Sequence, residues 1–368
     1  EADQLRRAMA AWQRNGTLDT FERKLIDGML ARGHQREFAE RLFRQMQGFG
    51  EYGFPESHAA SFALLAYASA WIKCHYPAAW CCALLNSQPM GFYSPSQLVQ
   101  EVRRHGVTVL PIDIDCSIWD CTLENCSSSV AIRLGLRQID GLAQTAAARI
   151  VAARHGHAFD NLHDLAHRAQ LQSHELTLLA GAGALQRLGG HRRQAHWRSA
   201  AIEELRPLFD AVECAAGVTA DDGVLLAAPC EAEEIAQDYR SQGLTLGRHP
   251  LAMLRDREPF VRCRTASALA ALDGVRFVRV AGLVTGRQRP GTASGVLFLT
   301  LEDETGNINV IVWRDRQERF RKALLCARLL LVKGVLESRD GVTHVIAGEL
   351  IDHSAALGTL RTTSRDFH

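Results

Sequence analysis

The chain has 368 residues, enough for two or three domains with their own cores, and its 47 % hydrophobic and 23 % charged residues are ordinary for a folded protein. This composition excludes a largely disordered chain. Because 42 Lys and Arg stand against 41 Asp and Glu, for a formal net charge of +1, charge alone neither indicates nor excludes nucleic-acid binding.

Residues 1 to about 105 are predicted to be helical, because apolar residues recur every three or four positions and charged residues fill the opposite faces. A glycine- and aromatic-rich break over 48–55 precedes a second apolar helix, which begins at Ser57-His58 and should end near Tyr76-Pro77. Its most apolar stretch, 59–70, is too short to span a bilayer, so no membrane contact is expected.

Beyond this helical part, a strand is predicted over 107–114, a polar connection over 116–129, helices over 133–200 and an irregular region over 205–274. From residue 275 to 352 the apolar period becomes two. Five strands are expected there, with a helix over 316–325 between the third and the fourth, at 276–284, 296–303, 307–313, 329–337 and 343–350. That order is typical of an OB barrel. The predicted fold class is therefore multidomain, α-helical and then all-β.

The strongest local motif is the run from Leu136 to Leu142, followed by a helix of small residues with Ile150 on its apolar face. Gly141 permits a turn with positive φ and a close backbone approach, so the free N–H groups of the next helix can contact a phosphate. This is the helix-hairpin-helix pattern, which holds DNA without reading bases. The predicted DNA contacts are Gly141, Leu142 and Arg149.

A second, weaker copy is predicted at 178–185, with Gly181 and Gly183 as further DNA contacts, so the two hairpins form a tandem. The surrounding segment is rich in arginine: Arg133, Arg137, Arg149, Arg154, Arg168, Arg187, Arg192, Arg193 and Arg198. The alternative interpretation is that Gly141 ends a helix between packed helices and the arginines form a solvated face.

Ser57 and His58 at a helix start offer an anion site, in which a hydroxyl, a chargeable imidazole and backbone N–H groups would suit a triphosphate. Arg6 and Arg7 could add neutralising charge. The alternative for Ser57 and His58 is a capped core helix with an exposed histidine. The alternative for Arg6 and Arg7 is that they lie on the solvent-exposed face of an amphipathic helix.

In the predicted barrel, Leu297, Leu299 and Leu301 share one strand face, which leaves Phe298 on the other. Phe298 and Trp313 are predicted to stack on bases of single-stranded DNA, and Arg287 and Arg289 in the first long loop to follow its backbone. The two aromatic side chains could equally pack against a neighbouring domain.

The ten cysteines show no paired C-x-x-C spacing, so reduced, mostly buried thiols of a cytoplasmic protein are expected, without a structural metal. Asp113 and Asp115 share a strand face and could hold Mg²⁺, but a solvent-facing strand end explains them better. Known phosphate-loop, dinucleotide and zinc-protease motifs are absent from the sequence.

The chain resembles the C-terminal half of bacterial C-family DNA polymerases, the DNA polymerase III alpha subunit family. The resemblance rests, in chain order, on residues 49–77, 83–87 and 131–136 and on the terminal barrel. The amino-acid sequence at 53–62 and 86–93 is most similar to that of the error-prone, ImuC-type paralogue. The resemblance implies distal fingers over 1–115, a tandem helix-hairpin-helix domain over 125–200, a connecting region over 201–274, an OB domain over 275–352 and a tail over 353–368.

The same resemblance implies that Arg6, Arg7, Ser57 and His58 contact the triphosphate of the incoming dNTP. Catalysis would need Mg²⁺ held by palm carboxylates, for which this chain has no motif, so no catalytic residue is assigned. Pro55-Glu56 stands where the replicative pattern has Asn-Lys, which removes a cation. Residues 205–209 lack the leading Gln of the clamp-binding motif, so a mutasome partner protein is expected to provide the link to the sliding clamp.

The expected function is DNA-directed DNA synthesis across lesions, with the chain contributing contacts to duplex primer-template and single-stranded template. Two alternatives stay open: a non-enzymatic DNA-binding adaptor of a repair complex, and the C-terminal part of a replicative alpha subunit.

Overall fold

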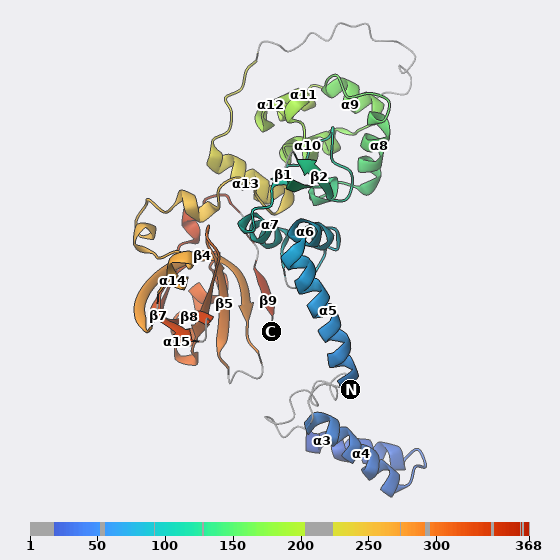
Figure 1. Ribbon diagram of the computed structural model, residues 1–368, viewed down its shortest axis with the longest axis vertical. Coiled ribbons are helices and arrows are strands. Elements are labelled where there is room, and N and C mark those ends of the chain that lie inside the picture. The colour runs from blue at the N-terminus through green and yellow to red at the C-terminus, as the bar shows by residue number, and fades with distance from the viewer. Residues whose placement is uncertain are drawn as a thin grey trace.

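The computed structural model describes residues 18–51, 56–91, 93–126, 129–202, 224–272, 274–290, 295–339, 342–360, 362 and 364–367. Figure 1 shows them as an N-terminal helical arm, a mainly helical domain and a C-terminal barrel. The predicted fold class, a helical region with a helix-hairpin-helix domain followed by an OB barrel, is confirmed. No helix in these ranges is both long and apolar enough to cross a membrane.

The arm consists of helices that follow one another in the chain (Figure 1): α3 (Leu18–Leu30), α4 (Arg36–Glu51), α5 (Glu56–His75), α6 (Pro77–Asn86) and α7 (Pro95–Arg104). The predicted break at Tyr76-Pro77 is present, because proline begins α6 at its first turn. Helix α5 is apolar on all sides, and the described neighbours leave Leu64 71 % and Tyr67 72 % exposed.

A small three-stranded sheet precedes the hairpins, in the order β1-β3-β2, from β1 (Val109–Leu110), β2 (Thr122–Cys126) and β3 (Ser129–Arg133). The predicted strand over 107–114 is therefore much shorter, and the predicted polar connection contains β2. The pairing of β2 with β3 is antiparallel. Strand β2 could not be recognised by alternation, because Leu123 points to solvent and its other side chains are polar.

The helix-hairpin-helix domain follows, with η1 (Leu136–Gln138), α8 (Gln144–Arg154), α9 (Leu162–Arg168), α10 (Ser173–Gly181), α11 (Gln186–Gly189) and α12 (Arg192–Ala200). One hydrophobic core joins these helices to α6, α7 and the small sheet, through side chains such as Leu85, Val99, Ile132, Ile150 and Leu179. The end of the arm and the hairpins are therefore one packed unit.

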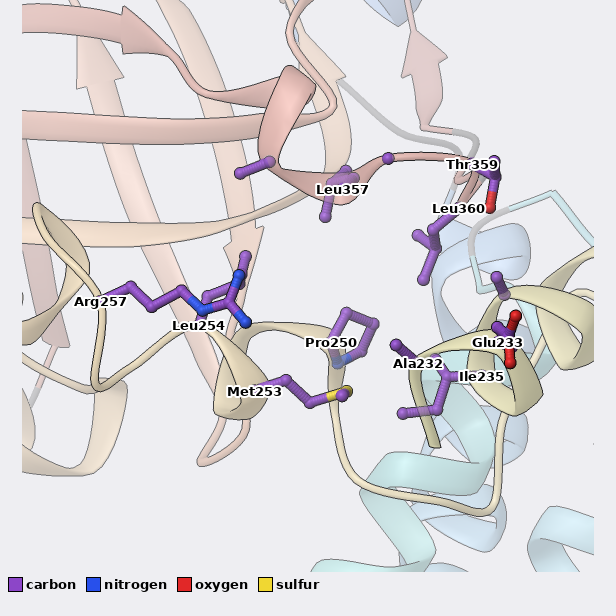
Figure 2. A pocket seen from close by; sticks show the side chains of 13 residues that line it. Ala232, Glu233, Ile235, Pro250, Met253, Leu254, Arg257, Leu357, Thr359 and Leu360 are labelled. Atoms are coloured by element: carbon purple, nitrogen blue, oxygen red, sulfur yellow. The ribbon is translucent and has the colours of Figure 1, made fainter. Parts of the chain in front are cut away.

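The region predicted to be irregular contains α13 (Glu231–Gln242), η3 (Pro250–Met253), η4 (Phe260–Arg262) and α14 (Ala266–Ala270). Three acidic residues in the first turn and Gly243 in the left-handed conformation after the last turn favour α13. Ile235 and Tyr239 of α13 pack with Leu329 and Leu331 of the barrel. A hollow of about 280 Å³ lies between α13, η3 and residues 356–360, with Ile235, Met253 and Leu357 among its aliphatic walls (Figure 2).

The barrel consists of β4 (Arg276–Gln288), β5 (Leu297–Glu302), β6 (Asn307–Val312), β7 (Leu329–Arg339) and β8 (Val342–Asp352), with α15 (Arg314–Arg319) and α16 (Arg321–Cys326) between β6 and β7. Pairing runs β5-β6-β8-β7-β4, and β4 also pairs with β5, which closes the barrel. After η5 (Ser354–Leu357), β9 (Arg365–Phe367) pairs in parallel with the end of β4. Alternate side chains of each strand fill the interior.

Candidate nucleic-acid interface

The turn before α8 has the conformation that the sequence predicts. Gly141 has φ +83°, and the N–H of Leu142 donates a 3.2 Å hydrogen bond to the carbonyl oxygen of Ile139. The Leu142 side chain is buried, so only its backbone could contact a ligand. The turn is therefore held by the core from below, while Gly141 itself is exposed.

The start of α8, directly after the Gly141 turn, has backbone N–H groups that could bind an anion. Ala143 is the N-cap and provides no side-chain acceptor. Among the described residues, the backbone N–H groups of Ala143, Gln144 and Thr145 find no acceptor, and all three residues are exposed. Unsatisfied N–H groups at the positive end of a helix are a ready site for phosphate.

These backbone donors at Ala143, Gln144 and Thr145 were not among the predicted site residues. A sequence signal for them exists, because alanine is a poor N-cap where serine, threonine, aspartate or asparagine is usual. A helix start that lacks its own cap leaves donors available to a ligand. The residue types, rather than any charge, therefore mark the site.

Arg149 lies on α8 but its guanidinium is engaged within the domain. Nη2 contacts both carboxylate oxygens of Glu175 at 2.8 and 2.7 Å, and Nε donates a 3.0 Å hydrogen bond to the carbonyl oxygen of Ala169. Glu175 is only 6 % exposed. A phosphate would have to compete with this buried carboxylate for Arg149, so the structure gives the side chain a role in packing α8 against α10.

The predicted second hairpin lies between α10 and the four-residue α11. Gly183 has φ +75°, as a left-handed turn requires, and the guanidinium of Arg192 lies directly over it. Gly181 faces Gln237 of α13 and is buried. Both glycines allow close internal packing here, and their contact with DNA stays a prediction.

The arginine-rich segment is an ion-pair network. All but Arg198 of its arginines bind a carboxylate or carbonyl oxygen of another described residue. The ion pairs are Arg133–Glu124, Arg137–Asp120, Arg149–Glu175, Arg168–Asp164, Arg187–Asp115, Arg192–Asp238 and Arg193–Glu233, and Arg154 binds the carbonyl oxygens of Ile114, Cys116 and Ser117.

Two of these ion pairs change the pKa of one partner in the direction that favours its charged form. The hydrogen bond from Arg133 lowers the pKa of Glu124, and the hydrogen bond to Asp115 raises the pKa of Arg187. Asp115 is thus the partner of an arginine, and neither Asp113 nor Asp115 lies on a strand, because β1 ends at Leu110. The basic segment does not supply a row of unpaired cations, so the hairpin depends on its backbone donors.

The predicted triphosphate contacts cannot be described in the same detail. Ser57 and His58 lie in the first turn of α5, where backbone N–H groups point outward, and their side chains are outside the described residues. Arg6 and Arg7 lie outside the described residues as well. Their contact with a nucleotide stays a prediction.

On the barrel, the three leucines Leu297, Leu299 and Leu301 are buried, and Phe298 is 37 % exposed, as the strand alternation predicts. Phe298 is opposite Ile311 in the β5–β6 register. Trp313 follows two residues after Ile311 and is 50 % exposed. The two aromatic residues therefore border the same outer face of β5 and β6, where side chains of OB folds meet nucleic acid.

Arg287 corrects one prediction. It belongs to β4, which continues four residues beyond the predicted end, and it is 8 % exposed. Nε donates a 2.7 Å hydrogen bond to the carbonyl oxygen of Leu324, and Nη2 one of 2.6 Å to that of Ala327. This arginine therefore lies on a strand and not in the predicted loop, and its guanidinium fixes the end of α16 to the barrel. Arg289, just beyond β4, is exposed as predicted.

Among the cysteines that the structure describes, fewer are buried than predicted: Cys81, Cys82 and Cys121 are buried and Cys263 is half-buried, whereas Cys74, Cys116, Cys126, Cys230 and Cys326 are exposed. Within the described ranges, His157, Asp160 and Asp164 form the one group of three potential metal ligands. Arg168 already donates to His157 Nδ1 at 3.0 Å and to Asp164 at 2.9 Å. The Arg168 guanidinium thus lies where a metal ion would have to bind.

Two features characterise this chain: an uncapped, exposed helix start behind a glycine turn, and a five-stranded barrel with exposed aromatic residues. Both are typical of domains of the helix-hairpin-helix and OB classes. Residues 106–195 match the helix-hairpin-helix motif family, and residues 278–352 match the OB-fold nucleic acid binding domain family.

Over its whole length, the chain is homologous to bacterial proteins named error-prone DNA polymerase, as the sequence resemblance indicated. It is 54 % identical to that of Saccharophagus degradans, 56 % to that of Azoarcus sp. and 53 % to that of Pseudomonas syringae pv. tomato. The match covers 100 % of this chain and 36, 35 and 36 % of these proteins, so the chain spans about a third of their length.

Proposed function

We propose that this chain is the DNA-holding, C-terminal part of an error-prone DNA polymerase that acts in damage-induced translesion synthesis. The observation that carries the proposal is the exposed start of α8, where Gly141 turns the backbone and Ala143, Gln144 and Thr145 offer N–H groups to a phosphate. Such a grip suits a polymerase, because it holds duplex of any sequence.

The barrel is proposed to hold the single-stranded template, through Phe298 and Trp313 with Arg289 nearby. Their exposure and shared face support this role. The proposed boundaries are those given by the resemblance: fingers over 1–115, hairpins over 125–200 and barrel over 275–352.

The incoming dNTP is proposed to bind at the start of α5, through Ser57 and His58 with Arg6 and Arg7. Support comes from the position of Ser57 and His58 in the first helical turn. Helix α5 is also apolar on every face, as is typical of a helix enclosed by protein. Further parts of the polymerase are proposed to cover it.

Polymerisation would use Mg²⁺, which activates the primer hydroxyl and stabilises the leaving pyrophosphate. The described residues do not fit such a site, because the one cluster of three candidate ligands already holds Arg168. We place the metal ligands outside this chain. The chain alone is therefore expected to bind DNA in the bacterial cytoplasm and to incorporate no nucleotide.

The route to the sliding clamp is proposed to run through a mutasome partner protein. Residues 205–209, which lack the leading Gln of the direct motif, lie outside the described residues. Their sequence alone supports this part of the proposal.

The experiment compares the pure chain with the intact polymerase from which it comes, in DNA binding and in primer extension. The proposal requires the chain to bind primer-template without extending it, and the intact protein to extend it. Incorporation of dNTP by the chain alone would overturn the assignment of the metal ligands. An intact protein that binds DNA but never extends a primer would favour the adaptor instead.

A further inference from the structure

A second hollow lies on the barrel, away from the face that carries Phe298. It measures about 400 Å³ and is bounded by Arg262 of η4, Arg279 of β4 and Lys333 of β7, over a floor that includes Leu331 and Ile351. Strand β4 separates this hollow from β5, because β4 pairs with β5 on one edge and with β7 on the other.

The charges at this hollow are arranged in an unfavourable way for the barrel alone. Arg279 is directly opposite Lys333 in the β4–β7 register. Like charges in such a pair destabilise a sheet. Lys333 contacts Glu349 of β8 at 2.9 Å, but the described residues provide no hydrogen-bond or ion-pair partner for the Arg279 guanidinium, and Arg279 is exposed. The cross-strand pair therefore leaves a surplus cation facing solvent.

The acidic residue that lines the hollow is Glu258, which forms a 2.9 Å ion pair with Arg262. Both side chains of that pair are about 60 % exposed, at 64 and 59 %. Ion pairs in such a setting contribute little and rearrange easily. Arg262 and Lys333 could thus exchange their carboxylates for phosphate oxygens, and Arg279 would gain its first partner.

An exposed aromatic side chain continues the same surface. Phe277 is 67 % exposed and stands two residues before Arg279 on β4, so the two side chains leave the strand on the same face about 7 Å apart. It is opposite Val335 of β7. A cationic groove beside an aromatic platform is the combination that binds single-stranded nucleic acid.

We propose that this hollow, bounded by Arg262, Arg279 and Lys333 and flanked by Phe277, is a second single-stranded DNA site on the barrel. It takes a backbone phosphate on the cations and a base on the Phe277 ring. The inference rests on the proposed DNA-binding function and adds a surface that neither the hairpin nor the Phe298 face accounts for. An acidic peptide would use the cations but would gain less from the aromatic ring.

The test measures binding of labelled oligothymidylate to the full chain by fluorescence anisotropy over a salt series. The variant is Arg279→Glu with Lys333→Glu. Its matched control is Arg321→Glu with Lys322→Glu, which reverses two exposed cations on α16 of the same barrel. Circular dichroism establishes that both variants are folded.

The β4–β7 variant is expected to bind at least tenfold more weakly, with a salt slope shallower by about 1.4, since each of two phosphates that the variant no longer neutralises accounts for about 0.7. Phe277→Leu is expected to weaken binding about tenfold without changing the slope. The α16 control should bind like the wild type.

Unchanged affinity and slope in the folded β4–β7 variant would overturn the inference, and so would an equal loss in the α16 control. Displacement of the oligonucleotide by polyglutamate at equal charge concentration would replace single-stranded DNA by an acidic peptide as the ligand. A wild-type chain that binds no DNA at all would instead contradict the proposed function.

Discussion

The backbone N–H of Asp140, in the turn of the first hairpin, donates a 2.8 Å hydrogen bond to the carbonyl oxygen of Ser241, at the end of α13. The same helix binds Arg192 through Asp238 and packs Tyr239 against the barrel. One helix therefore holds the first hairpin turn and the barrel in a fixed relation. On the proposed function, a primer-template junction would meet both surfaces at a set distance.

Arg149→Ala is expected to destabilise the fold and to leave the salt dependence of duplex binding unchanged. The substitution leaves the buried Glu175 carboxylate without its charged partner, at a cost of about 2 kcal/mol. Urea unfolding measures the loss, and Glu175→Gln in the same background should recover part of it. A salt slope lowered by about 0.9 in the folded variant would instead make Arg149 a phosphate contact.

Phe298→Ala and Trp313→Ala are expected to weaken single-strand binding, each by about 1–3 kcal/mol, with no loss of thermal stability beyond a few degrees. Arg287→Met should lower the thermal stability and leave single-strand binding unchanged, because the Arg287 guanidinium holds α16 by hydrogen bonds to Leu324 and Ala327. Anisotropy and thermal unfolding of the three variants separate the roles. A stable Arg287→Met protein that loses DNA binding would restore the predicted backbone contact.

Acid should loosen the contact between α5 and α7. Partial burial acts to raise the pKa of Glu101, but hydrogen bonds from Lys73 and Arg104 outweigh it and lower the pKa from 4.5 to about 2. A depressed carboxyl pKa stabilises the fold above pH 4.5, and this stabilisation disappears as the pH falls from 4.5 towards 2.

Thermal unfolding of the wild type and Glu101→Gln across this pH range measures that contribution. The two proteins should differ in stability at neutral pH and converge near pH 2. A difference that persists unchanged at low pH would assign the effect of Glu101→Gln to packing.

The buried thiols should resist alkylation. Burial, together with Cys121 and Cys82 nearby, raises the pKa of Cys81 to about 12, and burial raises that of Cys82 to about 11. At about pH 8.5, where an ordinary thiol is half ionised, iodoacetamide should modify exposed Cys126 and Cys326 while Cys81 stays free until the protein is unfolded. Mass spectrometry of peptides gives the order, and early modification of Cys81 would contradict the packing of α6.

The barrel could be predicted from the sequence because its period of two comes directly from the alternation of core and solvent. The short β2 and the helix α13 could not. Strand β2 has few apolar residues and is held by its pairing with β3. Helix α13 buries only Ile235 and Gln242 along its length, and its register is fixed by partners distant in sequence.

At the candidate site, the position of the first hairpin followed from Gly141 and the small residues after it. The roles of the arginines did not. Glu124, Asp238 and Glu233 neutralise Arg133, Arg192 and Arg193 from the preceding strand and from α13. Counting charges within one segment cannot reveal such pairs, because the partners meet only in the folded chain.

Binding of duplex DNA by Gly141→Val shows whether the turn before α8 presents backbone donors to phosphate. Its Cβ would contact the Leu178 side chain, and valine strains a φ of +83°, so the turn that presents the donors would have to shift. The control is Gly33→Val, which imposes the same kind of strain at φ +86° in open space between α3 and α4. Anisotropy is measured on duplexes of different sequence.

We expect at least tenfold weaker binding for Gly141→Val with little dependence on sequence, and wild-type binding for Gly33→Val. Wild-type affinity of a folded Gly141→Val protein would show that the turn before α8 does not hold duplex DNA.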